Sequence, residues 1–558
     1  MLEDLVRKFA LQNAILHNGK ADEGAVIGKV IAARPELKSE IKDVMKVIKS
    51  IVAEVNALTL NQQKKMLEEK APELLEKKVI KKAELPDLPK VEKKTVMRFA
   101  PGPSGPLHIG HTRAAILNDE YVKRYSGKYL IRLEDTNPMN IDPEAYESII
   151  DDLKWLEIEF HEVVIQSDRF EIYYEHAKKL LELGKAYICT CDVEDWRNAK
   201  LKKKPCPHRN QEPEKQQEMW ERMLRGDFKE QEASLVVKTD LNHPNPAVRD
   251  FVGFRVVNEP HPRTDEKYCV YPLYNFSVAI DDYLMGMTHV LRGKDHLNNT
   301  YRQQFIFDHF GWKKPTYIHY GLVQIVDTTL KTTLIKNGIK KGEFTGWDDI
   351  KLATLKTLAK RGIEPEAIRR YWIESGIKEV DIQFSWDTLF AFNKDIVDDV
   401  ANRYFFVWDP KELKIVGINS LEGHAPLHPD HPDRGIRKTI VEGKEGLSIF
   451  VTQDDMARAE IGEKIRLKDL CNIKLLTEKE AKYIGNDLSI LKEGVKIIHW
   501  VKEDAVPTKL LMPDGTVKEG ICEHILKEDI GKVVQFERLG FVRVKEIDGK
   551  YEAYFAHR

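Results

Sequence analysis

From Val96 onward the sequence alternates short β-type runs with amphipathic helical stretches, and this alternation restricts the fold more than any other feature. The runs at 95–100, 129–135 and 163–168 are largely apolar, and a helical stretch follows each of them. The second helical stretch has a good start signal in the Asp-Pro pair at 142–143. Strands that alternate with helices predict a parallel α/β sheet, which binds its ligands at the carboxyl ends of the strands.

The rest of the chain has other sequence patterns. Residues 1–77 carry apolar positions at helical spacing with a break at Pro35, and 78–92 hold two prolines among many charges. These patterns predict a separate helical appendage, a scaffold or docking module, followed by an extended linker. Residues 189–290 interrupt the alternation and indicate an insertion, and helices are expected at 346–393.

Two further expectations concern sheets. The pattern of the α/β region is expected to resume around YIHYGLVQIV, at 317–326. Beyond about residue 395 the texture becomes all-β, with short runs such as LKIVGI and LSIFVT separated by Gly, Asp and Pro turns. That pattern predicts one or two β-barrels.

Composition excludes several classes of protein. The 88 basic and 90 acidic residues give a net charge of −2, which excludes a polybasic coat but permits a local positive face that binds nucleic acid. Six cysteines in 558 residues cannot form a disulfide framework and favour a reducing, cytoplasmic setting. No apolar run approaches the roughly 18 to 20 residues of a membrane span, and the N-terminus lacks a signal-peptide core. We therefore expect neither a membrane protein nor a secreted one.

The string RFAPGPSGPLHIGH at 98–111 joins a strand end to a helix start. Gly102 and Gly105 permit close approach of a ligand to the backbone, and the helix N-terminus offers free N–H groups to phosphate. His108 and His111 face the same side of the first turn. Two imidazoles there can donate hydrogen bonds to a triphosphate as negative charge builds during displacement. The alternative, a helix cap with incidental histidines, is disfavoured by the combination of strand, turn and H-I-G-H.

A second cluster carries metal-binding residue types. Cys189 and Cys191 are followed by Cys206 and His208, and two close pairs of such ligands suit a tetrahedral structural zinc. Reduced free thiols are the alternative, and the sequence leaves both open. The other cysteines, at positions 269, 471 and 522, have no partner in the sequence pattern and are expected to be plain thiols.

H-I-G-H in this setting resembles the signature of class I aminoacyl-tRNA synthetases. Three further strings, RLEDTNP at 132–138, YPLYNFSVAIDDYLMGMTHVLRGKDHL at 271–297 and GEFTGWDD at 342–349, resemble the glutamyl/glutaminyl branch of that class. The helical appendage and the β-rich C-terminal part resemble the archaeal-type glutamyl-tRNA synthetases. The resemblance covers nearly the whole chain, and its separated motifs agree in order and spacing.

The resemblance implies a multidomain α/β plus β fold that attaches L-glutamate to tRNA-Glu with ATP and Mg2+, through glutamyl-adenylate. It implies a cytoplasmic monomer that needs bound tRNA to activate glutamate, and it leaves open whether tRNA-Gln is also charged. The predicted segments are the N-terminal helical appendage and linker (1–90), the first half of a Rossmann-type catalytic domain (91–188), an acceptor-stem insertion (189–290), the second half with a KMSKS-like loop (291–335), a helical connector (336–394) and anticodon-binding β-barrels (395–558).

The resemblance also assigns roles to single residues. Arg98 matches the arginine that holds the amino-acid α-carboxylate, Glu134 the acid that holds the α-amino group, and Tyr274 a tyrosine of the same pocket. Arg292 stands where glutamyl enzymes carry arginine and glutaminyl enzymes a neutral residue. We therefore expect glutamate, because a glutamine amide would leave that charge buried and unpaired. A structural arginine paired with Asp295, or a glutaminyl-tRNA synthetase, is the alternative. The residues assigned to ATP are Pro101, Gly102, Ser104, His108, Gly110 and His111.

One motif departs from the family pattern. The KMSKS-type loop reads Leu-Lys-Thr-Thr-Leu-Ile at 330–335, so the signature lysine falls on Leu334. In the family that lysine neutralises pyrophosphate in the transition state, and losing such a donor costs roughly 3 kcal/mol. Either Lys331 or Lys336 takes over this catalytic role, or adenylation is weakened and the chain is a tRNA-binding relative.

Overall fold

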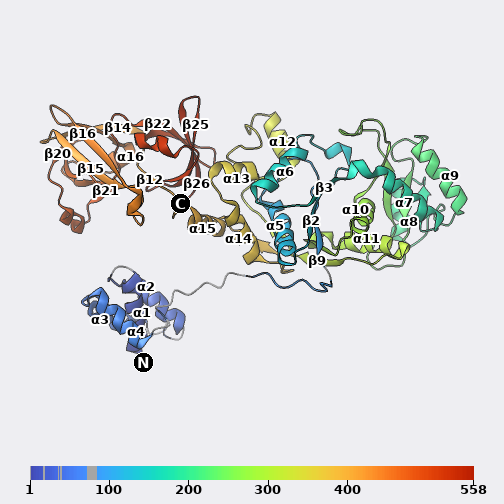
Figure 1. Cartoon of the computed structure of the whole chain (residues 1–558), viewed down its shortest axis with the longest axis horizontal. Coiled ribbons are helices and arrows are strands. Elements are labelled where there is room, and N and C mark those ends of the chain that lie inside the picture. Colours follow the sequence, from blue (N-terminus) through green and yellow to red (C-terminus); the bar gives the residue numbers. More distant parts are fainter. Residues whose placement is uncertain are drawn as a thin grey trace. The chain divides into compact units, whose positions relative to one another are not determined.

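Two compact units, Met1–Ala83 and Glu84–Arg558, make up the chain in this computed structural model (Figure 1). The structure describes residues 2–16, 19–34, 37, 41–71, 74, 84–92 and 94–558. The break predicted at Pro35 and the first part of the predicted linker, 78–83, lie outside the described residues. No helix in the described ranges is both long enough and apolar enough to cross a bilayer.

The N-terminal unit is built from helices around an aliphatic core. The helices described there are α1 (Leu2–Leu16), α2 (Glu23–Ala33), α3 (Ile41–Asn56) and α4 (Leu60–Lys70). Val6, Val26 and Ile48 are fully buried between them, as their helical spacing requires. Thr59 and Gln62 form a capping box at the start of α4. The helical prediction for this part is confirmed for the residues that the structure describes.

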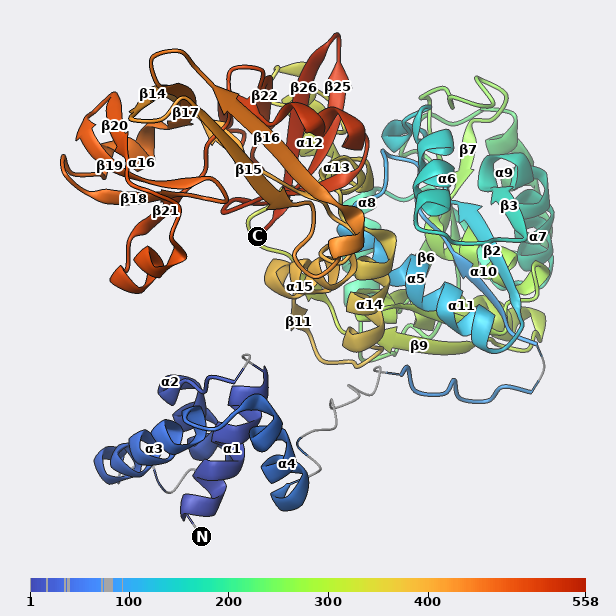
Figure 2. The ribbon, with the colours of Figure 1, turned by 60° about the vertical axis from the view of Figure 1, so that its left-hand side comes forward.

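A parallel sheet begins the second unit, as the alternation predicted. Strands β1 (Val96–Phe99), β2 (Lys128–Leu133) and β3 (Glu162–Ile165) pair in parallel and in chain order. The helices that follow them are α5 (Ile109–Arg124), α6 (Ala145–Trp155) and α7 (Phe170–Glu182). Helix α5 packs against β1 and β2 (Figure 2).

Helix α6 starts later than its sequence signal indicates. Asp142 and Pro143 precede it in a turn, and the first helical residue is Ala145. The cause is local hydrogen bonding: the side chain of Asp142 accepts the N–H of Glu144, and its backbone N–H donates to the Pro103 carbonyl. The side chain of Asp142 thus bonds within the turn before the helix, and Glu144, the residue directly before Ala145, makes no side-chain cap hydrogen bond to a described residue.

The parallel arrangement resumes at β8 (His289–Gly293), which pairs in parallel with β9 (Thr316–Tyr320). Thr288 donates its N–H to the Val96 carbonyl at 3.0 Å, so β8 lies beside β1. The expected resumption at 317–326 is therefore one strand too late, because β8 is short and carries a histidine and an arginine. Helices α10 (Tyr274–Leu284) and α11 (Leu297–Phe310) flank this strand in sequence.

The insertion is an antiparallel sheet with a helical cover. Its strands are β4 (Ala186–Cys189), β5 (Ser234–Val237), β6 (Phe251–Val256) and β7 (Val270–Pro272), in chain order, and its helices are α8 (Val193–Leu201) and α9 (Pro213–Leu224). Trp220, Phe254 and Phe276 pack edge to face in its core, together with residues of α7.

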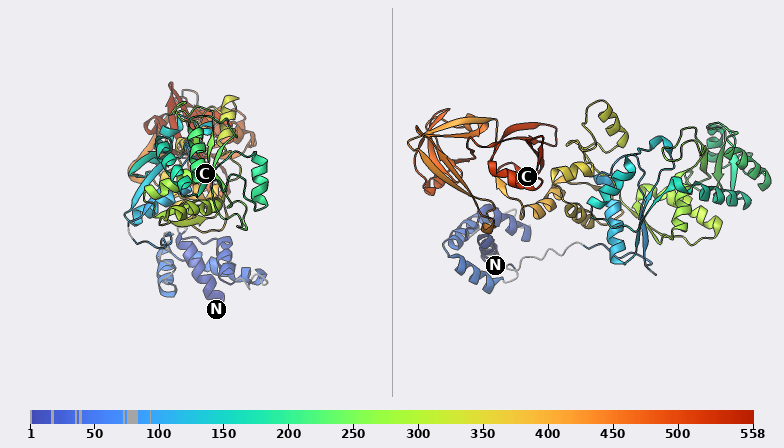
Figure 3. Two further views of the ribbon diagram at one scale, coloured as in Figure 1. Left: turned by 90° about the vertical axis from the view of Figure 1, so that its right-hand side faces the viewer. Right: turned by 45° about the horizontal axis from the view of Figure 1, so that its top comes forward.

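Helices connect the α/β part of the second unit to its β-rich part (Figure 3). They are α12 (Thr332–Lys340), α13 (Leu355–Arg361), α14 (Pro365–Ser375) and α15 (Trp386–Val397), with the short parallel pair β10 (Val323–Gln324) and β11 (Ile382–Gln383) beside them. Arg361 donates to the carbonyls of Phe555 and Ala556, which ties α13 to the last strand.

Two large sheets form the C-terminal part. A seven-stranded sheet has the order β12-β24-β25-β26-β22-β23-β13, and a six-stranded sheet has the order β17-β14-β20-β19-β18-β21. The edge strands β12 and β13 of the first sheet are separated in sequence by Phe405 alone, so this sheet curls until its edges meet, as a barrel does. The all-β prediction beyond residue 395 is confirmed. The strands are β12 (Arg403–Tyr404), β13 (Phe406–Trp408), β14 (Pro410–Val416), β15 (Ser420–Pro426), β16 (Ile436–Glu442), β17 (Leu447–Thr452), β18 (Lys464–Leu467), β19 (Cys471–Thr477), β20 (Glu480–Tyr483), β21 (Lys496–Ile498), β22 (Val506–Leu511), β23 (Val517–Cys522), β24 (Val533–Phe536), β25 (Gly540–Ile547) and β26 (Lys550–His557).

We predict that Gly127→Ala destabilises the second unit. Gly127 joins α5 to β2, and an added Cβ would overlap the backbone carbonyl of Thr95, which already accepts the N–H of Lys128 at 2.7 Å. Overpacking of this kind costs about 1 to 3 kcal/mol, so the calorimetric midpoint of the second unit should fall. The control is Gly28→Ala, because Gly28 lies within α2 with open space around its Cβ position. An unchanged midpoint in Gly127→Ala would contradict this account.

Candidate active site

The turn between β1 and α5 forms one wall of the site and ends at His108, the N-cap of α5. Leu107 donates its N–H to Oδ2 of Asp152 on α6 at 2.8 Å inside the protein, and burial raises the pKa of Asp152 to about 7. A Cβ on Gly105 would come within 2.9 Å of Thr332 at the start of α12. Glycine is therefore needed where α12 closes on the turn.

The two histidines of H-I-G-H are stacked, with ring centroids 3.7 Å apart. Nδ1 of His108 accepts the N–H of Gly110 at 3.1 Å, and Nδ1 of His111 accepts the N–H of His108 at 3.2 Å. Burial lowers the pKa of His108 to about 4, and burial together with His108 lowers that of His111 well below 6.5. Both rings are therefore neutral near pH 7 and carry the proton on Nε2, where it can be donated to a ligand oxygen.

These histidines line a cavity of about 400 Å³ at the carboxyl ends of β1 and β8. Parallel sheets bind their ligands at this edge. The predicted site residues that line the cavity are Arg98, His108, Gly110, His111, Tyr274 and Arg292. The predicted residues that do not line it are Pro101, Gly102, Ser104, Glu134, Lys331 and Lys336.

Arg292 presents an uncompensated charge to this cavity. Its side chain is 5% exposed, and Nη2 donates to Thr300 Oγ1 at 2.6 Å and to Gln303 Oε1 at 2.8 Å. Within the part of the chain that the structure describes, no carboxylate forms an ion pair with Arg292, and its buried Nε has no hydrogen-bond partner. Asp295, the alternative partner, lies near His296 instead. A guanidinium in this state calls for an anionic ligand.

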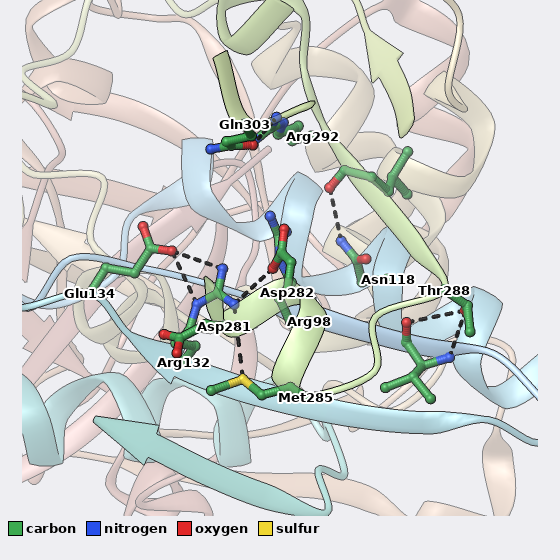
Figure 4. Close-up of polar contacts among 12 residues, drawn as sticks. Arg98, Asn118, Arg132, Glu134, Asp281, Asp282, Met285, Thr288, Arg292 and Gln303 are labelled. Carbon is green, nitrogen blue, oxygen red and sulfur yellow. Dashed lines mark hydrogen bonds and ion pairs between the residues drawn. The ribbon is translucent and has the colours of Figure 1, made fainter. Parts of the chain in front are cut away.

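Arg98 and Glu134 are linked by two further charged residues (Figure 4). Nε of Arg98 lies 3.1 Å from Oδ1 of Asp282, and the same oxygen lies 2.8 Å from Nη1 of Arg132. Nη2 of Arg132 lies 3.1 Å from Oε1 of Glu134. Burial raises the pKa of Glu134 against the effect of Arg132. Burial acts in the same direction on Asp282, but Arg98 and Arg132 prevail and hold its pKa below the usual value.

The sequence interpretation did not single out Asp282 or Arg132. The signal that could have found them is an acidic pair, Asp281 and Asp282, inside an otherwise apolar helical run, FSVAIDDYL. Charges in such a run are buried and must be paired.

The KMSKS-like loop leads into α12 and is not part of the cavity lining, apart from Leu330. Lys331 is the exposed N-cap of α12, and Leu334 is 55% exposed. Lys336 Nζ lies 3.2 Å from Oδ2 of Asp142, the residue whose N–H is bound to the β1–α5 turn. The structure therefore brings Lys336 towards the turn and leaves Lys331 without an ion pair among the described residues.

The four predicted metal ligands lie together at the base of the insertion. The ligand atoms of Cys189, Cys191, Cys206 and His208 are all within 4.8 Å of one another. Nδ1 of His208 faces the thiols, at 3.3 Å from Cys191 Sγ, while its Nε2 lies 3.0 Å from Thr190 Oγ1. The threonine thus fixes the ring with Nδ1 towards the cluster.

Comparison with protein families gives one consistent result. The family model described as "tRNA synthetases class I (E and Q), catalytic domain" matches residues 94–399. Two models of the anti-codon binding domain of the same class match 401–489 and 497–545. The chain therefore belongs to the class I tRNA synthetases of the E and Q group. The expected resemblance and fold class are confirmed.

Curated relatives match along the whole chain. A protein of Methanocaldococcus jannaschii named "Glutamate--tRNA ligase" is 47% identical over 565 residues, which cover 100% of both chains. Relatives of the same name are 46% identical in Thermoplasma volcanium, over 100% of both chains, and 48% identical in Methanocorpusculum labreanum, over 99% of this chain and 98% of the relative.

We predict that neither ring of H-I-G-H takes up a proton between pH 8 and about 5.5 in the free protein. An unfolded chain binds a proton at an ordinary histidine near pH 6.5, whereas folded His108 does so at about 4. The free energy of unfolding therefore decreases as the pH falls from about 6.5 towards 4, because the unfolded chain binds the proton first. Carbon-13 NMR of labelled Cε1 atoms measures the protonation of each ring against pH, and the His108→Gln and His111→Gln variants assign the two signals. An inflection near pH 6.5 for either ring would show that the rings are not desolvated donors.

Proposed function

We propose that the protein attaches glutamate to tRNA-Glu in an ATP-dependent reaction that passes through glutamyl-adenylate. The observation that carries this proposal is Arg292, a buried guanidinium that faces the cavity with no carboxylate partner in the described residues. The γ-carboxylate of glutamate supplies the missing charge, whereas a glutamine side chain leaves it unpaired. The relatives named Glutamate--tRNA ligase support the same substrate.

In the first step, an α-carboxylate oxygen of glutamate attacks the α-phosphorus of ATP, and pyrophosphate leaves. We assign His108 and His111 to donate hydrogen bonds from Nε2 to phosphate oxygens, with the N-terminus of α5 adding the positive end of its dipole. Both histidines stay neutral, so they stabilise charge without transferring a proton. Mg2+, when bound with ATP, would supply further charge neutralisation. In the second step, a terminal ribose hydroxyl of tRNA attacks the carbonyl carbon, and AMP leaves.

The amino acid is assigned to the other end of the cavity. Arg98 is assigned to the α-carboxylate and Arg292 to the γ-carboxylate, and both line the cavity. Glu134 lies outside the cavity lining, at the other end of the ion-pair chain from Arg98, and is assigned to the α-amino group. The Tyr274 hydroxyl, 3.4 Å from Nη1 of Arg292, accepts a hydrogen bond from that guanidinium and helps to orient it. Three charged contacts of alternating sign define the three charged groups of glutamate.

The tRNA is assigned to three parts of the chain. Its terminal ribose reaches the cavity, its acceptor stem lies on the insertion at 189–290, and its anticodon is read by the sheets beyond residue 395. The matches to anti-codon binding domains at 401–489 and 497–545 support the last assignment. We propose that the enzyme works as a cytoplasmic monomer.

We further propose a structural zinc at the cluster of Cys189, Cys191, Cys206 and His208. The Sγ atoms of Cys189 and Cys206 are 3.8 Å apart, which is the ligand–ligand distance of a tetrahedron with Zn–S bonds of about 2.3 Å. All four positions are filled by protein, so the metal would fasten β4 to the loop before α9 and take no part in catalysis.

Purified protein should contain about one zinc ion per chain by mass spectrometry, and chelation should lower its melting temperature. Cys206→Ser should lose the metal, because three ligands hold zinc poorly. Cys269→Ser is the control, since Cys269 lies outside the cluster. Equal zinc contents in Cys206→Ser and the parent protein would rule out this site.

The altered loop favours a second candidate, a tRNA-binding relative that activates glutamate poorly. Leu334 occupies the position of the signature lysine and cannot neutralise pyrophosphate.

Lys336 is the better substitute of the two nearby lysines, because its partner Asp142 is anchored to the turn that ends at His108. We propose that Lys336 supplies the missing charge.

ATP–pyrophosphate exchange in the presence of tRNA separates these candidates. Exchange is expected with glutamate and not with glutamine, and Arg292→Gln should raise the KM for glutamate roughly 10- to 100-fold. Lys336→Ala should lower kcat roughly 100-fold, because it removes a donor that acts on developing charge. Lys340→Ala, an exposed lysine of the same helix, should change little. No exchange at all, with tRNA still bound, would favour the non-catalytic relative.

A further inference from the structure

Arg98 and Glu134 are the two ends of a continuous chain of buried ion pairs, Arg98–Asp282–Arg132–Glu134 (Figure 4). We propose that the inner pair, Asp282 and Arg132, consists of positioning residues that fix the separation of the two ends. The fixed separation makes the pocket selective for an α-amino acid zwitterion. This inference rests on the proposed function, because it takes glutamate as the ligand that the two ends hold.

Burial separates the inner pair from the ends. The side chains of Asp282 and Arg132 are 0% exposed, whereas those of Arg98 and Glu134 are 5% and 12% exposed. The inner residues are closed off by protein and cannot reach a ligand. Their effect on the amino acid must act through the residues at the ends.

The strand register explains why Arg98 needs this support. Arg98 on β1 is in register with Leu130 on β2, so Arg132, two residues further along β2, lies on the same face of the sheet. Two guanidinium groups side by side on adjacent strands repel each other. Asp282, which α10 brings in from the other half of the domain, places one oxygen between them and removes that repulsion.

The hydrogen-bond pattern leaves the ends free for a ligand. Asp282 engages Nε of Arg98, and the two terminal nitrogens of that guanidinium have no described partner, so they can bind a carboxylate side by side. Arg132 engages Oε1 of Glu134 and leaves Oε2 for an ammonium group. The inner pair thus sets both the spacing and the orientation of one cation and one anion.

An unpaired atom also points to function. Oδ2 of Asp282 is buried without a hydrogen-bond partner in the described residues. A buried carboxylate oxygen without a hydrogen-bond partner lowers the stability of the folded state, so the position of Asp282 is not the one that stability alone would favour. The arrangement is consistent with a carboxylate whose position is dictated by the two guanidinium groups that it must separate.

The test is Asp282→Asn, compared with Asp281→Asn as a matched control. Asp281 is the adjacent residue, equally buried, but it binds Arg169, Gln166 and Tyr173 and does not belong to the chain of ion pairs. In ATP–pyrophosphate exchange with tRNA, Asp282→Asn should raise the KM for glutamate roughly 10- to 100-fold and leave the KM for ATP within about twofold. Asp281→Asn should leave both constants within about twofold, whatever it does to thermal stability.

A second readout isolates the zwitterion. Glutarate lacks the α-amino group, so its inhibition constant in the parent protein should be higher than the KM for L-glutamate. In Asp282→Asn the ratio of these two constants should be smaller. If Asp282→Asn is insoluble, Asp282→Glu replaces it, because it keeps the charge but displaces the carboxylate by one methylene group, and the same split is expected.

The two possible failures are distinguishable. Suppose that the parent protein exchanges with glutamate, but Asp282→Asn raises both Michaelis constants alike or raises neither. That result would overturn the positioning role and leave the proposed function standing. Parent protein that shows no exchange with glutamate would overturn the proposed function and the positioning role with it.

Discussion

The turn between β1 and α5 holds its shape through hydrogen bonds to other elements, and the whole cavity depends on it. Leu107 gives its N–H to Asp152, and its carbonyl accepts the N–H of Leu355 at 3.0 Å. Ile109 donates to the carbonyl of Ala353 at 3.0 Å. The histidines bind backbone N–H groups with Nδ1, so the direction of each Nε2 proton follows the backbone of this turn. Helices α6 and α13 therefore fix the turn that carries both histidines, although Asp152 and Leu355 do not line the cavity.

The two ends of the cavity use different electrostatics. In the proposed reaction, the phosphate end relies on His108 and His111, which burial keeps neutral. The amino acid is held by the full charges of Arg98 and Arg292, which line the cavity, and of Glu134, at the other end of the ion-pair chain from Arg98. A neutral donor binds the ground-state triphosphate modestly and gains most when negative charge increases, which favours the transition state. Full charges suit the amino acid, whose groups are charged from the start. The division matches the proposed reaction, in which negative charge builds on the phosphates as pyrophosphate leaves, while glutamate arrives with its groups already charged.

Local pattern was enough to predict the architecture and much of the site. Strand–helix alternation predicted the parallel sheet, and H-I-G-H predicted paired imidazoles at a helix start. What local pattern missed depends on distant contacts: Arg132 and Asp282 are 150 positions apart in sequence, and nothing near either residue indicates the other. Strand β8 was missed because it is short and its two polar side chains make their contacts outside the strand: Arg292 faces the cavity, and His289 contacts the Pro89 carbonyl. The late start of α6 was missed because the backbone N–H of Asp142 donates to the carbonyl of Pro103, which lies 39 positions earlier in the chain.

The C-terminal sheets are nested in the sequence. All six strands of one sheet lie between β13 and β22 of the other, and β13 and β22 both pair with β23. The segment from β14 to β21 therefore leaves the outer sheet at β13 and returns to it at β22, and β23 lies between these two strands. The outer sheet can close only after that long segment has been brought back on itself, so the inner sheet is the natural unit to form first. In the described part of the chain, no strand of the inner sheet pairs with a strand of the outer sheet, but Phe405 and Val407 at β13 pack in the core of the inner sheet. A replacement for the inner sheet would therefore keep every strand pairing of the outer one and would have to preserve that apolar contact.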